Sequence, residues 1–479
     1  MGDMHDGGGP RAGAGPLTIT FNTRRNTLEQ ETYHYELQDV KEPNLFREIF
    51  PYIEPPKIPF NHRHVPMNPP DEIWITDTTF RDGQQARPPF TVKQIVDLYT
   101  MLHRLGGPNG VIRSSEFFLY SANHKKAVTA CLEQGFRYPE ITGWIRANKE
   151  DFRLVRQMGL RETGILTSVS DYHIFLKLRK TRRETMEMYL DIVRSALEAG
   201  IVPRCHLEDI TRADFYGFVV PFVQELMRLA QQAEIPVKVR ACDTLGYGVS
   251  YPGASMPRSV PGIIYGLVHH AGVPSEWLEW HGHNDFYKVL INASTAWLYG
   301  AAAANGAVLG LGERTGNTPI EALVFEYIGL RGTANGLQPH VITEIAEYLE
   351  RECGHVVPPN QPFVGRDFNV TRAGIHADGL MKDEEIYNIF DTDALLHRPV
   401  AVAISDTSGT AGIAHWVNTH FQLSPDRRIE KSHPGVAEIA RAIAKEYEDG
   451  RTTSMSNPEM EALARRFIPE LAAHDPPAS

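Results

Sequence analysis

The sequence predicts an α/β protein built on a (β/α)8 TIM barrel, followed by a smaller, mainly helical subdomain. From about residue 71, short apolar runs alternate with amphipathic stretches of helical length, which indicates a parallel sheet. Eight such units fit within residues 71–330, close to the ~250 residues that a closed barrel usually needs. An open, doubly wound sheet is the alternative. The glycine-rich dinucleotide turn expected after its first strand is absent.

Four segments are predicted along the 479 residues. Residues 1–16 are expected to be a disordered leader, because they are glycine-rich and lack the basic and apolar parts of a signal peptide. Residues 17–70 are expected to be a proline-marked N-terminal arm that wraps a neighbouring surface, such as a second subunit. Residues 71–330 form the predicted barrel domain, and residues 331–479 form a post-barrel linker and helical subdomain.

The barrel strands are predicted from apolar runs, and the helices from the amphipathic stretches between them. The predicted strands are Ile73–Thr78, Val111–Phe117, Glu140–Trp144, Gly164–Val169, Val202–Glu208, Val237–Cys242, Leu278–Gly282 and Ala307–Leu311. The predicted helices include Val92–Leu105, Glu184–Ala199, Gly217–Gln232 and Lys288–Ala304. After the barrel, a β-like run from Val400 to Ser405 precedes a helical stretch from Gly409 to His420.

Composition argues against several classes of partner. A net charge of −11 without a dense basic block argues against nucleic acid and anionic membranes. The short basic run Lys177–Arg183 is interpreted as the solvated start of a helix. The four cysteines form no C-x-x-C pair, which argues against a zinc knuckle and a disulfide framework. No run of ~18 apolar residues predicts a membrane span, and we expect a protein of the reducing cytoplasm.

A divalent metal site is predicted at one end of the barrel, because reactive residues of TIM barrels gather at the carboxyl ends of strands. The first predicted strand leads to Asp82, and the seventh carries His281 with His283 two residues later. Residues at this spacing share one face of a strand, so both histidines can reach one ion. Alone, a His-x-His pair is more often incidental and Asp82-Gly is more often a turn. Their joint placement at strand ends favours a metal site with open positions for substrate.

Longer motifs around these residues resemble a known family. The segment Arg81-Asp-Gly-Gln-Gln85 resembles the signature of the DRE-TIM metallolyase superfamily, and His281-Gly-His-Asn-Asp285 is similar to its second signature. Gly310–Asn317 resembles the family's eighth-strand loop. The residues that this resemblance implies as ligands of a divalent metal are Asp82, His281, His283 and, as a fourth candidate, Asn317. Mn²⁺ is the ion we expect, and Mg²⁺, Co²⁺ or Zn²⁺ would also suit these ligands.

Segments after the barrel narrow the resemblance. Ala373–Gly379, Tyr387 and Ser405–Gly412 resemble parts that isopropylmalate and homocitrate synthases carry after their barrels and that lyases generally lack. The resemblance implies a homodimeric acyltransferase that joins acetyl-CoA to a 2-oxo acid. A metal-dependent C–C lyase or carboxyltransferase remains the alternative from another class. A barrel without catalysis is a further alternative, against which the presence of Arg81 and the metal candidates argues.

The predicted fifth strand bears on the substrate, because Arg204, His206 and Glu208 alternate and therefore face one side. A buried arginine needs an anion, which is either Glu208 or an acidic group of the substrate. The resemblance to homocitrate synthases implies the second role for Arg204, and the bulk of His206 implies a shorter substrate, such as oxaloacetate. Thr79–Pro89 and Pro203–Asp209 are most similar to the subgroup of Re-citrate and 2-phosphinomethylmalate synthases. Oxaloacetate, its phosphinate analogue and 2-oxoglutarate stay open as substrates, with isopropylmalate synthesis as a further alternative.

The same resemblance implies chemical roles for five residues. Thr244 is expected to bind the C1 carboxylate of the 2-oxo acid, and Arg81 to stabilise the developing alkoxide. His376 is the expected acid–base residue, polarised by Glu208 or assisted by Tyr387. If His376 comes from the partner chain, dimerisation is needed for activity. No short motif identifies the residues that bind CoA.

Overall fold

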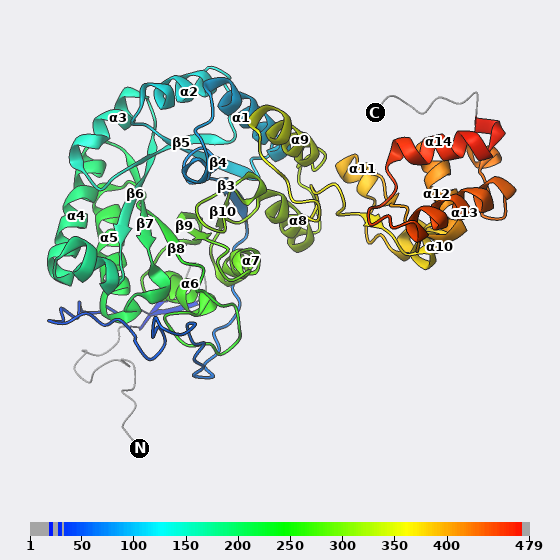
Figure 1. The fold of residues 1–479 in the computed structure, drawn as a ribbon. Coiled ribbons are helices and arrows are strands. Elements are labelled where there is room, and N and C mark those ends of the chain that lie inside the picture. The colour runs from blue at the N-terminus through cyan, green and yellow to red at the C-terminus, as the bar shows by residue number, and fades with distance from the viewer. Residues whose placement is uncertain (1–18, 23–26, 31–32, 472–479) are drawn as a thin grey trace. The chain divides into compact units, whose positions relative to one another are not determined.

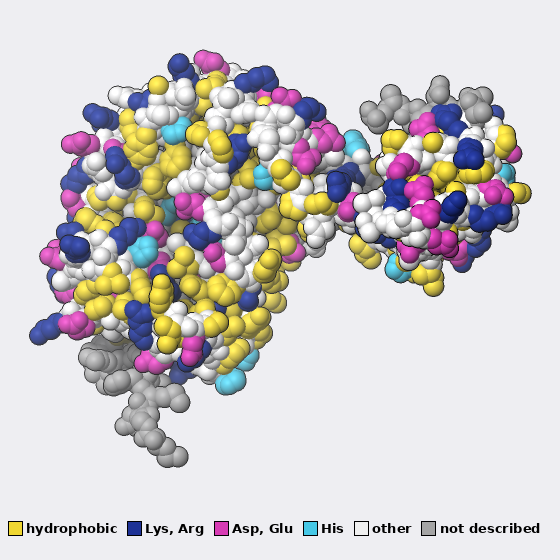
Figure 2. Space-filling model, in the orientation of Figure 1, with side chains coloured by type: hydrophobic (Ala, Val, Ile, Leu, Met, Phe, Trp, Pro, Cys, Tyr) yellow, Lys and Arg dark blue, Asp and Glu magenta, His cyan; other side chains and the backbone are white. Residues whose placement is uncertain are grey.

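Figure 1 shows the computed structural model, which describes residues 19–22, 27–30 and 33–471. The leader expected at residues 1–16 lies outside the described residues. The chain divides into two compact units, Met1–Gln338 and Pro339–Ser479. On the face drawn in Figure 2, basic and acidic side chains are interspersed over the surface of each unit. The negative net charge is therefore not gathered into one patch of that face.

The first unit is a closed barrel of eight parallel strands, with its helices on the outside (Figure 1). The strand order is β10-β3-β4-β5-β6-β7-β8-β9, which confirms the predicted fold class. The barrel strands are β3 (Trp74–Asp77), β4 (Ile112–Phe118), β5 (Glu140–Ile145), β6 (Glu162–Ser168), β7 (Val202–Glu208), β8 (Lys238–Asp243), β9 (Leu278–Gly282) and β10 (Ala303–Gly306). Two further strands, β1 (Ile19–Asn22) and β2 (Thr27–Gln30), pair with each other in antiparallel fashion.

Amphipathic helices follow the barrel strands and bury their apolar faces against them. The helices of the first unit are α1 (Val92–Gly106), α2 (Ala122–Leu132), α3 (Phe152–Gln157), α4 (Arg182–Glu198), α5 (Val220–Ala233), α6 (Val260–His269), α7 (Val289–Tyr299) and α8 (Ile320–Arg331). In α1, the Thr91 hydroxyl accepts a hydrogen bond from the Gln94 backbone N–H and so caps the first turn. Ile95, Leu98 and Leu102 follow at helical spacing and are buried.

The last strand of the barrel corrects the sequence prediction. The predicted strand Ala307–Leu311 is wrong, because the strand is Ala303–Gly306 and a 3₁₀ turn follows it. The predicted helix Lys288–Ala304 is too long for the same reason, since α7 ends at Tyr299 and Gly300 follows with a φ of 128°. The alanine run after Gly300 favours helix by propensity. It forms a strand because it pairs with β3 and β9 on both sides.

Residues 33–70 of the N-terminal arm pack on the surface of their own barrel. The backbone carbonyl of Gln38 accepts a hydrogen bond of 2.9 Å from Arg182 Nη1. The same guanidinium is fully buried and pairs with Asp171 at 2.7 Å. Arg182 belongs to the run Lys177–Arg183 that was interpreted as solvated. Its burial corrects that interpretation, because the arm and Asp171 enclose it.

The second unit has a small core of its own. Its elements are α9 (Val341–Cys353), β11 (Val370–Thr371), α10 (Gly374–Lys382), α11 (Thr392–Leu396), β12 (Ala401–Val402), α12 (Gly409–His420), α13 (Pro434–Glu448) and α14 (Asn457–Phe467). β11 and β12 pair in parallel. Val417, Ile439 and Met460, from three helices, are buried in one apolar cluster. Across both units, none of the described helices combines the length and apolarity needed to cross a membrane.

Because the second unit has its own apolar cluster, we expect residues 339–479 alone to unfold cooperatively. Ile439→Ala should lower the free energy of unfolding by about 2–5 kcal/mol, since Ile439 is fully buried in that cluster. Glu438→Ala, at a half-exposed neighbouring position outside that cluster, should change it by less than about 1 kcal/mol. Urea denaturation followed by circular dichroism measures both. A gradual loss of signal with urea, without a folded baseline, would contradict the expectation that this unit has an independent core.

Candidate active site at the carboxyl end of the barrel

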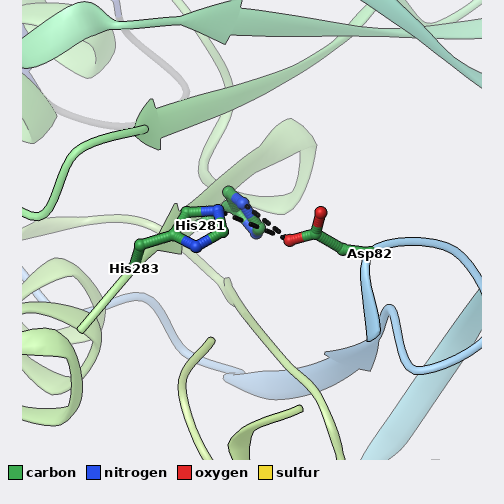
Figure 3. A group of neighbouring side chains, drawn as sticks. All are labelled: Asp82, His281 and His283. Atoms are coloured by element: carbon green, nitrogen blue, oxygen red, sulfur yellow. Dashed lines mark ion pairs between the residues drawn. The ribbon is translucent and has the colours of Figure 1, made fainter. Parts of the chain in front are cut away.

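The three predicted metal ligands meet at the carboxyl end of the barrel (Figure 3). Asp82 follows β3, His281 lies in β9 and His283 comes directly after β9. Asp82 Oδ2 lies 3.4 Å from His283 Nε2 and 3.7 Å from His281 Nε2. All three side chains are buried, and their ligand atoms lie within 4.8 Å of one another. Among the described residues, they are the one group of His, Cys, Asp and Glu arranged to hold a metal ion.

The surroundings keep these ligands in the forms that bind a cation. Burial opposes the ionisation of Asp82, but the positive charge of Arg81, together with the two histidines and a hydrogen bond from Asn317, outweighs it and lowers the pKa of Asp82 to about 2. Burial lowers the pKa of His281 to about 3, against the opposing charge of Asp82. Near neutral pH, Asp82 is therefore an anion and His281 is neutral. Metal binding requires these deprotonated forms.

Buried polar atoms at this site also fit a metal. Asp82 Oδ2 and Asn317 Oδ1 are buried acceptors without a hydrogen bond among the described residues. Leaving such atoms unsatisfied is costly, and a bound cation would satisfy both. His281 Nδ1 lies 2.8 Å from Asn305 Oδ1, which orients the ring so that Nε2 stays free for the cluster. The residues present thus suit a divalent ion, and Asn317 lies beside the three ligands because its backbone forms a β-bridge with His283.

Arg81 lies next to Asp82 and is held on two sides. Its Nε donates to Glu116 Oε2 at 2.8 Å, and its Nη1 donates to Asp82 Oδ1 at 3.1 Å. The guanidinium carbon lies 5.8 Å from the centre of the Trp144 ring. A fixed positive charge therefore lies beside the metal ligands. There it can stabilise negative charge that develops on a reacting oxygen.

Arg204 does not have the surroundings that its predicted role requires. Its guanidinium contacts Glu162 at the start of β6, and Nη1 donates to Glu279 Oε2 at 3.3 Å. These partners lie in the amino-terminal half of the barrel. The predicted pairing of Arg204 with Glu208 is wrong, because the barrel brings two other carboxylates to Arg204. Since these carboxylates already satisfy the guanidinium, the structure also removes the reason to assign Arg204 to a substrate anion.

Two charged residues that no motif had indicated, Glu116 and Arg240, complete the interior. Arg240 is fully buried, and it donates to Glu116 Oε2 at 3.0 Å and to Glu279 Oε2 at 2.8 Å. The strand register pairs Arg240 with His206 and with Glu279, one side-chain layer below His281. Their signal in the sequence was a charged residue in the middle of a predicted barrel strand. Such a residue is almost never buried unless it is paired.

His206 lies in this layer and depends on a glycine. Its Nε2 is 3.3 Å from Glu116 Oε1. Gly164 of β6 leaves the space for both side chains, because a Cβ at that position would lie 2.6 Å from His206 Nε2 and 2.9 Å from Glu116 Oε1. Burial, together with the charge of Arg240, lowers the pKa of His206 to about 4. The imidazole is therefore neutral near pH 7.

Glu208, at the carboxyl end of β7, forms a separate polar cluster. Its Oε2 lies 2.9 Å from His173 Nδ1 and 3.1 Å from Lys177 Nζ, and Ser168 also donates to it. His173 and Lys177 belong to a π-helical turn, Tyr172–Leu178, a conformation that is frequent at functional sites. Burial opposes the ionisation of Glu208, but the hydrogen bond from His173 helps to lower its pKa to about 2. Glu208 is therefore a carboxylate with a positive or hydrogen-bonding group on each side.

The remaining predicted residues lie in two places. Thr244 follows β8, and its hydroxyl accepts a hydrogen bond of 2.8 Å from the Asp209 backbone N–H. His376 and Tyr387 belong to the second unit, where their ring centres are 4.5 Å apart. Both are exposed, and so is the neighbouring Ile375, of which 75% is accessible. The structure brings His376 and Tyr387 together, as the hypothesis of a joint role requires.

Comparison with known proteins gives consistent matches. The model of the HMGL-like family matches residues 72–349. A Citrate (Re)-synthase of Syntrophus aciditrophicus is 59% identical over 95% of this chain and 73% of its own length. A Citrate (Re)-synthase of Clostridium kluyveri is 57% identical over 93% of this chain and 98% of its own length.

A more distant relative is the 2-phosphinomethylmalate synthase of Streptomyces hygroscopicus, which is 37% identical over 90% of this chain and 98% of its own length. The family model covers more than half of the chain, and it includes the metal cluster and the interior charge network. The chain therefore belongs to the HMGL-like family.

Proposed function

We propose that this protein is a metal-dependent acyltransferase that condenses acetyl-CoA with oxaloacetate and that water then hydrolyses the resulting thioester, giving citrate and free CoA. The observation that carries the proposal is the buried cluster Asp82, His281 and His283 beside Arg81, in a chain 57–59% identical to two Citrate (Re)-synthases. Use of a phosphinate analogue of oxaloacetate is the variant of this reaction suggested by the 37% identical 2-phosphinomethylmalate synthase.

Asp82, His281 and His283 would hold the metal ion, with Asn317 as a fourth ligand candidate. Mn²⁺ is the ion we propose, and Mg²⁺, Co²⁺ or Zn²⁺ would meet the same ligands. When bound, the ion supplies Lewis acidity toward the ketone of the oxo acid and orients that substrate. The cluster is buried, and electrostatic interactions are stronger in such surroundings than in water.

The roles of the protein groups follow from their partners. Arg81 would donate to the ketone oxygen as it gains negative charge, while Glu116 and Asp82 fix its guanidinium. The Thr244 hydroxyl would donate to the C1 carboxylate of the oxo acid. His376, in contact with Tyr387, would take the proton from the acetyl methyl group. Glu208, whose charge is held by His173, would stabilise the protonated imidazole of His376.

For the distal end of the oxo acid, we propose His206 as the contacting residue. His206 lies one layer below His281, and its Nε2, 3.3 Å from Glu116 Oε1, has no other polar partner among the described residues. Arg204, which was expected in this role, is satisfied by Glu162 and Glu279. A short C4 acid would end at the imidazole of His206. Isopropylmalate and homocitrate synthesis are alternatives with other oxo acids, and a metal-dependent lyase or carboxyltransferase is the alternative from another class.

The first test is thiol release from acetyl-CoA with Mn²⁺ and one of four acids: oxaloacetate, its phosphinate analogue, 2-oxoglutarate or 2-oxoisovalerate. We expect turnover with a C4 acid, its abolition by EDTA, and at least about a 100-fold loss of kcat in Asp82→Ala or His283→Ala, because each removes a metal ligand. Lys93→Ala, at an exposed position, should retain wild-type activity. Turnover with 2-oxoisovalerate alone would contradict the oxaloacetate proposal, and no thiol release with any acid would favour a lyase.

The dimeric part of the proposal is tested by mixing two inactive variants. Arg81→Ala and His376→Ala chains, unfolded and refolded together, should recover about a quarter of wild-type activity if His376 acts on the barrel of a partner chain. In such a mixture, half of the dimers are mixed and each has one intact site. Each variant refolded alone should stay inactive and serves as the control. No recovery on mixing would place both residues in a site made by one chain.

The protonation state of His206 predicts how the free energy of unfolding depends on pH. Its pKa is about 4 in the folded protein and 6.5 in an unperturbed histidine, so between these values the unfolded chain binds a proton that the folded protein does not. The free energy of unfolding therefore falls as the pH falls from 6.5 to 4. In metal-free His206→Asn this dependence should be shallower by up to about 1.4 kcal/mol per pH unit. Urea denaturation between pH 4.5 and 7 measures it, and parallel curves for the two proteins would contradict it.

A further inference from the structure

Glu116 is the point where the candidate active site and the interior charge network meet. Its side chain is 1% exposed, and its Oε2 accepts hydrogen bonds from Arg81 Nε at 2.8 Å and Arg240 Nη1 at 3.0 Å. Its Oε1 lies 3.3 Å from His206 Nε2 and 3.7 Å from Arg204 Nη1. One carboxylate thus contacts three guanidinium groups and one imidazole.

The contact with Arg81 differs from the others, because Arg81 lies beside the metal ligands. Glu116 engages Nε of Arg81, and Asp82 engages Nη1. Nη2 is then the one nitrogen of this guanidinium without a hydrogen bond among the described residues. The ring of Trp144, 5.8 Å from the guanidinium carbon, limits movement on a further side. A guanidinium held in this way can offer both N–H groups of Nη2 to a substrate oxygen.

We propose that Glu116 is a positioning residue, which fixes the guanidinium of Arg81 so that Nη2 donates to the oxygen that gains negative charge in the reaction. This inference rests on the proposed function, since it concerns the same site. Preorganised donors act without reorganising during the reaction, and their removal typically costs more in kcat than in KM. Glu116 itself need not touch the substrate.

Another buried carboxylate supplies a matched control. Glu162 is 6% exposed, contacts Arg204, and pairs with Lys238 at 2.5 Å. It neutralises buried cations as Glu116 does, but the structure records no contact between Glu162 and Arg81. If Glu116 only neutralised charge, Glu116→Gln and Glu162→Gln would have similar effects. If it positions Arg81, the two variants differ in kcat while both lose stability.

The experiment compares the full-length chain with its Glu116→Gln and Glu162→Gln variants, using Mn²⁺, acetyl-CoA and oxaloacetate. We expect kcat to fall roughly 10- to 100-fold in Glu116→Gln, with each KM within about 3-fold of wild type. Glu162→Gln should keep kcat within about 3-fold. Thermal unfolding of the metal-free proteins should show a lower Tm for both variants, because each removes one of the buried carboxylates that neutralise the buried cations.

A double-mutant cycle tests whether Glu116 acts through Arg81. In an Arg81→Lys background, adding Glu116→Gln should lower kcat by less than about 3-fold, because the group it positions is already gone. If Glu116→Gln does not fold, Glu116→Asp keeps the charge but withdraws it from Arg81, and should show the same loss of kcat. Equal losses in the Glu116 and Glu162 variants, or additive losses in the cycle, overturn the inference while the proposed function stands. Absence of wild-type turnover overturns both.

Discussion

The burial of three guanidinium groups inside one barrel is the constraint on which the rest of this site depends. Arg81, Arg204 and Arg240 are all nearly inaccessible to solvent, and an unpaired buried charge would cost several kcal/mol. Glu116 contacts all three, and Glu279 contacts two of them. The carboxylates thus make a charged interior tolerable. They also give each guanidinium a defined orientation, which an apolar interior could not do.

The same exclusion of water prepares the candidate metal site. Burial favours the neutral form of His281, whereas the charge of Arg81 favours the anionic form of Asp82. A site with an anionic carboxylate and neutral imidazoles is ready for a divalent ion without prior loss of protons. The interior network therefore serves the site in two ways, since it holds Arg81 in place and supplies the positive charge that keeps Asp82 ionised.

Much of the barrel was predictable from local sequence, because strands in a parallel barrel are buried on both faces and read as apolar runs. β7 and β9 have the predicted bounds, Val202–Glu208 and Leu278–Gly282. The strand Ala303–Gly306 was missed because alanine carries helical propensity, and only pairing with two neighbours makes it a strand. The candidate metal ligands were predictable because residues at the carboxyl ends of the strands lie together at one end of a barrel.

By itself, the sequence determined the fold class and brought Asp82, His281 and His283 to one edge of the barrel, because strand periodicity and strand ends are local properties. Only the tertiary structure decided which charges pair inside. Arg204 meets Glu162 and Glu279 rather than Glu208, and no motif indicated the contacts of Glu116. Such pairings join residues on different strands, far apart along the chain, and depend on the register and closure of the whole sheet. A local pattern can state that a buried charge needs a partner, but the partner is chosen by the assembled barrel.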